Sequence, residues 1–123
     1  MRTFIQTKLN ELEDIECGEM IPDDIIEDNV TYFGYQITRS YINNDFDKNC
    51  TYRVNLTGYA TRRIQADENT TQIVDDASED IVDKLKEINF KCNIEDASIE
   101  NNIRKSRITG HADYNEINKK LIV

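Results

Sequence analysis

The sequence has no tryptophan, one histidine, one proline and four glycines among its 123 residues. A single imidazole excludes sites that need two histidines, and so few glycines leave no glycine-rich loop to cradle phosphates. No stretch approaches the roughly 18 consecutive apolar residues of a membrane-spanning helix, and the N-terminus lacks the apolar run of a signal peptide. We therefore expect a soluble protein made in the cytoplasm, with no membrane partner.

Metal-binding patterns are weak. Cys17, Cys50 and Cys92 are widely spaced and odd in number, which is typical of reduced, buried thiols. The segment that contains Asp45 copies the start of a calcium-binding loop, but Cys50 and Leu56 stand where such a loop needs glycine and glutamate. The lone histidine, His111, has no second histidine or cysteine at ligand spacing, and we expect a surface or interface side chain. We predict no metal and no cofactor.

Catalytic patterns are equally weak. Carboxylates are plentiful, with 24 Asp and Glu, but they gather on the faces of the expected helices, where solvation explains them. No local signature pairs a cysteine with the histidine as a nucleophile. A sequence pI of about 4.6 disfavours nucleic-acid binding, because acidic helices repel a phosphate backbone. We predict that the protein is not an enzyme and has no catalytic residues.

Apolar periodicity predicts the fold. The first half of the chain is expected to form a helix over 2–16 ended by a left-handed Gly18, an acidic connector over 22–29, a strand over 30–40 and a loop over 41–49. The second half is expected to form a strand over 50–62, a helix over 71–88 and strands over 90–94 and 103–115. Asn69, Thr70 or Thr71 is expected to cap the second helix. The expected core joins Tyr52, Val54 and Leu56 to Ile81, Leu85 and Ile88. This order indicates a single α+β domain over 1–123, with a mainly antiparallel sheet and two helices packed on one face.

Charge is unevenly distributed along the chain. The segments 1–30 and 67–100 together carry −15, whereas 31–66 and 101–123 together carry +6, which gives the net charge of −9. Solvated helix faces explain this pattern, and so does a protomer with two oppositely charged sides that meet head to tail. On the second interpretation, the positive side is Arg53, Arg62, Arg63, Arg104, Lys105 and Arg107. The negative side is Asp75, Asp76, Glu79, Asp80 and Asp83.

The order of segments resembles one family. VTYFGYQITRSY and YRVNLTGYATRR follow the first helix and its proline-bearing connector as paired strands. IVDDASEDIVDKLKEINFKCNIED then runs from a helix into a strand, and ITGHADYNE closes the pattern. In this layout the chain resembles the small tail terminator proteins of tailed bacteriophages and phage-tail-like particles. The resemblance covers most of the chain but has no invariant motif.

The resemblance implies a structural virion protein that forms a homo-oligomeric ring, usually of six. Such a ring caps the tail tube protein, stops tube polymerisation and presents a surface to the head-side connector. The resemblance also implies that the protein is located at the neck of the virion tail, and in the host cytoplasm before assembly. DNA is expected to pass through the lumen of the ring without specific binding. The alternatives are a head-tail joining or neck protein and a non-phage regulatory or immunity protein that binds one partner.

Overall fold

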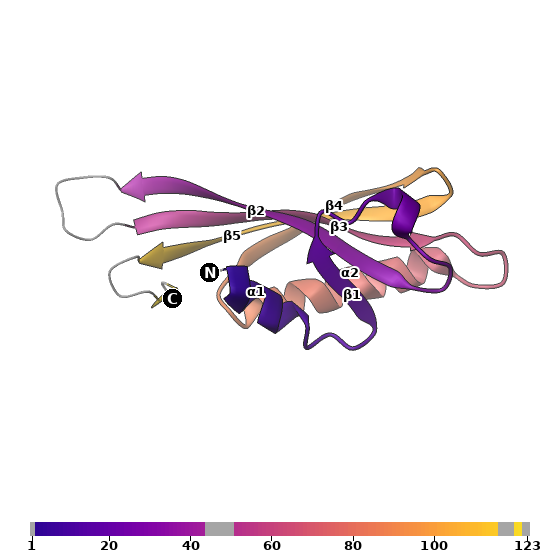
Figure 1. The fold of residues 1–123 in the computed structure, drawn as a ribbon, viewed down its shortest axis with the longest axis horizontal. Helices are drawn as coiled ribbons and strands as arrows, with labels where there is room; N and C mark the ends of the chain where they lie inside the picture. The colour runs from indigo at the N-terminus through magenta and orange to yellow at the C-terminus, as the bar shows by residue number, and fades with distance from the viewer. Residues whose placement is uncertain (1, 44–50, 116–119, 122–123) are drawn as a thin grey trace.

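The computed structural model describes residues 2–43, 51–115 and 120–121, which form two α-helices and a six-stranded sheet (Figure 1). The helices are α1 (Arg2–Leu9) and α2 (Thr70–Lys86), and a short 3₁₀ helix, η1, covers Asp23–Ile25. The strands are β1 (Ile15–Glu19), β2 (Thr31–Asn43), β3 (Thr51–Arg63), β4 (Lys91–Glu100), β5 (Ile103–Asn115) and β6 (Lys120–Leu121). The predicted α+β class is confirmed.

The sheet has the strand order β1-β2-β3-β5-β4, and β6 pairs with the end of β5. All strand pairs are antiparallel except β1 with β2, which is parallel. The three central strands have 13 residues each, and at one end they extend past both helices (Figure 1). We call this projecting end of β2, β3 and β5 the arm.

One face of the sheet packs against the helices and carries the hydrophobic core. Strand alternation turns Val54 and Leu56 of β3 towards α2, and both side chains are buried. Helix α1 adds Ile5 and Leu9, which are also buried. The predicted core residues found together in this cluster are Val54, Leu56, Ile81, Leu85 and Ile88. The side chain of Tyr52, also predicted there, lies outside the described part of the chain.

Helix α2 matches its predicted position closely. Its buried residues recur at steps of three and four, as the apolar pattern required. The Asn69 side-chain oxygen accepts a hydrogen bond from the Gln72 backbone N–H at 3.2 Å, so Asn69 is the N-cap. Lys84 and Lys86 lie in the last turn, where positive charge complements the helix dipole.

The prediction of one helix over 2–16 is wrong in its second half. Helix α1 ends at Leu9, and β1 pairs in parallel with the start of β2. Four acids over 11–16 oppose the negative C-terminal end of a longer helix, and from Ile15 onward the backbone pairs with β2 instead. Gly18 lies within β1, and no glycine in the described chain has a positive φ. The predicted left-handed cap at Gly18 is therefore also wrong.

Two further boundaries differ from the predictions. Strand β2 continues to Asn43, into the segment predicted as a loop, and the rest of that loop, with Asp45, lies outside the described residues. Strand β4 is longer than the predicted 90–94 because the pairing with β5 resumes after an irregularity between Ile94 and Ala97. In the described chain, neither helix is long and apolar enough to span a membrane.

Candidate functional site

The face of the sheet opposite the helices is polar and is called the open face here. Strand alternation places Thr57, Tyr59 and Thr61 of β3 on it. In the pairing register, Tyr59 lies opposite Arg107 of β5, and Thr61 lies opposite Lys105. The Tyr59 ring is 43% exposed, so this face offers both apolar and charged surface.

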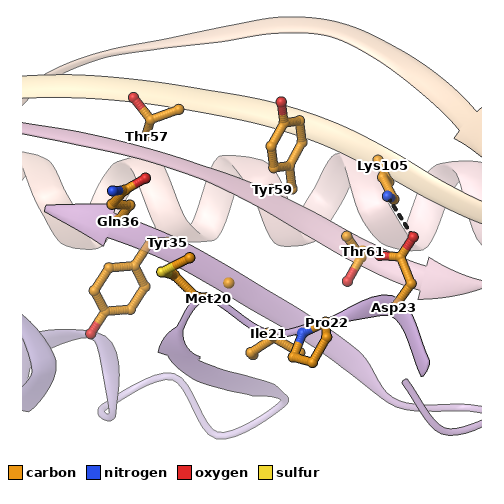
Figure 2. Close-up of a pocket in the computed structure, with 11 residues that line it drawn as sticks. Met20, Ile21, Pro22, Asp23, Tyr35, Gln36, Thr57, Tyr59, Thr61 and Lys105 are labelled. Atoms are coloured by element: carbon orange, nitrogen blue, oxygen red, sulfur yellow. Dashed lines mark hydrogen bonds and ion pairs between the residues drawn. The ribbon is translucent and has the colours of Figure 1, made fainter. Parts of the chain in front are cut away.

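The acidic connector between β1 and β2 crosses the open face. Glycine at position 34 allows this crossing, because a Cβ there would stand 2.9 Å from the backbone nitrogen of Ile21. The connector and the strands enclose a groove of about 360 Å³. Figure 2 shows Met20, Ile21 and Pro22 on the connector side, with Thr57 and Tyr59 on the strands.

Two of the predicted interface bases hold this connector in place. The Lys105 ammonium lies 2.9 Å from an Asp23 carboxylate oxygen (Figure 2), and this hydrogen bond raises the pKa of Lys105. The Arg63 guanidinium donates to the Ile26 carbonyl at 2.9 Å and lies 3.4 Å from the Asp28 carboxylate. The acidic connector is thus bound to basic strand residues of its own chain.

Two other predicted bases lie on the helix-covered face. The Arg62 guanidinium donates to both Glu68 carboxylate oxygens at 2.8 and 2.9 Å and to the Thr31 hydroxyl at 2.8 Å. This contact lowers the pKa of Glu68. Arg104, the cross-strand neighbour of Arg62, lies 4.0 Å from Asp75. Its Nε atom is buried and has no hydrogen-bond partner in the described structure.

The last two predicted bases are the most accessible. The Arg53 Nε atom lies 3.0 Å from an Asp113 oxygen, and an Arg107 terminal nitrogen lies 3.2 Å from Glu95. Their side chains are 39% and 45% exposed. The six bases therefore do not form one surface, because strand alternation sends Arg62 and Arg104 to the helix-covered face. Each of the six is paired with an acid of its own chain.

The predicted acids lie on α2, and all are exposed. Asp75 is engaged by Arg104, but the other four have no ion-pair partner among the described residues. These four, called the acidic stripe, are Asp76, Glu79, Asp80 and Asp83. Steps of three and four residues place them on one side of the helix. The structure thus leaves most of the predicted negative side available to a partner.

A second cavity, also of about 360 Å³, lies beside the start of β4 and was not predicted from the sequence. We call it the basic notch. Its polar lining is Arg53, Lys86, Asn89, Lys91, His111 and Asp113. Lys91 and His111 are cross-strand partners, and Arg53 and Asp113 are the next such pair along β5. Only the strand register brings these residues together, so no sequence pattern marks them.

The thiols are shielded. Cys17 and Cys92 are free and packed against the core, but they are half-buried and not fully buried as predicted. Burial raises the pKa of Cys17 to about 12 and that of Cys92 to about 11, because the thiolate is poorly solvated there. Both therefore stay protonated near neutral pH, which makes them poor nucleophiles. Cys50 lies outside the described residues.

Comparisons and metal-ligand geometry add no assignment. The sequence matches no protein-family model and no curated protein. In the part of the chain that is described, no three His, Cys, Asp or Glu side chains gather as metal ligands. The fold and the charged surfaces are therefore the features that bear on function.

Proposed function

We propose that this chain is a tail terminator of a tailed bacteriophage or phage-tail-like particle. In this role, copies form a ring that caps the tail tube, stops its polymerisation and joins the tail to the head-side connector. The observation that carries the proposal is the order of elements. A helix, a proline-bearing connector, a long hairpin, a helix that leads into a strand and a closing strand occur in this order, with β1 added between the first helix and the connector, and this order supports the proposal.

The shape of the sheet supports a role in assembly. The arm projects beyond the helical layer (Figure 1), so its strands can reach a neighbouring subunit. The two faces of the molecule also differ, since one carries the acidic stripe on α2 and the other is the open face. Unlike surfaces make head-to-tail contacts, which form a ring when the rotation between subunits closes.

The net charge fits a lumen through which DNA passes. Each chain carries −9, so every subunit adds negative charge to the ring. An acidic lumen repels phosphates and keeps DNA from binding during passage. Arg62, Arg63, Arg104 and Lys105 are already engaged with acids of their own chain, which reduces the positive charge they offer to DNA.

The decisive experiment is to delete the gene from the phage or prophage that carries it. We expect tails of uncontrolled length without joined heads, and normal particles when the wild-type gene is supplied in trans. Gold-labelled antibody against the chain should mark the head-proximal end of complemented tails in electron micrographs. Tails of normal length with joined heads after deletion would contradict the proposal, and a neck protein would leave tube length unchanged but heads unjoined.

A further inference from the structure

The basic notch carries positive charge that no acid among the described residues neutralises. The Arg53–Asp113 pair, at 3.0 Å, is balanced. Lys86 and Lys91 have no ion-pair partner among the described residues, and His111 adds a further nitrogen ligand for an anion. Both lysines are exposed, so their ammonium groups are open to a partner. The notch therefore offers cations with which carboxylates of a partner can pair.

The acidic stripe has the opposite property. Asp76 and Asp80 are four residues apart, as are Glu79 and Asp83, and like charges at this spacing destabilise an isolated helix. The stripe spans about 10 Å from Asp76 to Asp83 at 1.5 Å per residue. Nearby cations from another molecule would remove this repulsion. Lys84 and Lys86 follow on the same helix, but among the described residues no cation forms an ion pair with the stripe.

We infer that the basic notch of one copy receives carboxylates of the acidic stripe on α2 of a second copy. The two surfaces are unlike, although both include residues of α2, so a contact between them can be heterologous and propagate from subunit to subunit. The inference rests on the proposed ring, and it names the surfaces that build it. The sequence predicted Arg62 and Lys105 as cations that face a neighbour, but both are paired with acids of their own chain. We assign that role to Lys86 and Lys91 instead.

The test uses charge reversal in the full-length chain. Lys86→Glu/Lys91→Glu gives an acidic notch, and Asp76→Lys/Asp80→Lys gives a basic stripe. By sedimentation velocity at about 0.05 M salt, each variant alone should self-associate about tenfold more weakly than wild type, and at about 0.5 M salt this difference should shrink because the charges are screened. An equimolar mixture of the two should recover association, because each notch then meets a stripe of opposite sign. The quadruple variant should also associate by itself.

Controls separate this contact from general charge effects. Glu13→Lys/Asp24→Lys changes net charge as the stripe variant does, at exposed acids elsewhere, and should associate like wild type. Thermal melting checks that every variant is folded. If reversal unfolds the notch variant, Lys86→Gln/Lys91→Gln should still weaken association, but less.

Several outcomes overturn the inference. One is a wild-type chain that stays monomeric at every concentration, and another is a mixture that recovers nothing. A third is a wild-type chain that stays monomeric and melts at a higher temperature when inorganic phosphate is added, while the Lys86→Gln/Lys91→Gln variant does not. That result would mean that a free anion, and not a second copy, occupies the notch. Rings that persist in both reversal variants overturn the inference but leave the proposed function intact. If the notch and the stripe associate as inferred but the chain has no role in tails, the inference stands and the proposed function is wrong.

Discussion

On the helix-covered face of the sheet, α1 and α2 bury a continuous apolar cluster that includes Val54 and Leu85. On the open face, the acidic connector between β1 and β2 lies on polar strands and is held by Lys105 and Arg63. The first face is stabilised by burial, which scales with the apolar area removed from water. The second relies on partly exposed ion pairs, which contribute little individually. The two faces should therefore respond very differently to single substitutions.

Leu85→Ala should have the largest effect. Leu85 is fully buried in the core, so the substitution leaves a cavity between α2 and the sheet. The expected loss is about 2–5 kcal/mol of unfolding free energy. Chemical denaturation measures it, and Thr71→Ala, at an exposed position of the same helix, should change stability by less than about 0.5 kcal/mol. Equal midpoints for the two variants would contradict the assignment of this face as the core.

Gly58→Ala should come next. A Cβ at this position of β3 would lie 2.6 Å from Phe33 Cε1 and 2.7 Å from the Gly34 carbonyl oxygen. Because backbone must move to relieve the second contact, we expect a loss of about 1–3 kcal/mol. Gly18→Ala is the matched control, since its nearest atoms would be 3.8 Å away, which is ordinary contact. Comparable melting temperatures for Gly58→Ala and wild type would show that the packing at β2 and β3 is looser than described.

The contrast between the faces also decides what the sequence could reveal. The core was predicted because apolar residues recur with period two in β3 and with steps of three and four in α2. Those periods follow from local geometry alone. Asn69 was one of three predicted N-caps for the same reason, since its partner, Gln72, is three residues away.

The open face and the basic notch depend on residues distant in sequence. Lys105 and Asp23 are 82 positions apart, and Lys91 meets His111 only through the β4–β5 register. Strand β1 was missed because Leu12 and Ile15 continue the helical spacing of Leu9, and only the pairing with β2 places Ile15 in a strand. The sequence predicted which residues are charged, but not which of them are already paired.

Glu68→Gln tests an ion pair that the helix-covered face partly shields. The side chains of Arg62 and Glu68 are 12% and 17% exposed, so this pair should matter more than exposed pairs. Because the pKa of Glu68 is lowered in the folded state, its contribution is present above the ordinary glutamate pKa of about 4.3 and is lost as the pH falls through the lowered value. The variant should be less stable than wild type at neutral pH. The difference should shrink in acid, and a constant difference across this range would contradict the pairing.

The smallest effect is expected from the contact between Asp23 and Lys105 on the open face. A double-mutant cycle with Asp23→Asn and Lys105→Gln should give a coupling free energy of about 0.2–1 kcal/mol, because the Asp23 side chain is 37% exposed. High salt should reduce the coupling by screening.

Amide hydrogen exchange should nevertheless accelerate over 22–28 in Lys105→Gln, since the connector loses one of its attachments while the core keeps its protection. Arg107→Gln, which breaks a pair with Glu95 of β4 instead, is the matched control and should leave exchange in the connector unchanged. If exchange there stays slow in Lys105→Gln as well, the connector is held by apolar contacts of the buried Ile26, and the two faces of the sheet are stabilised in the same way.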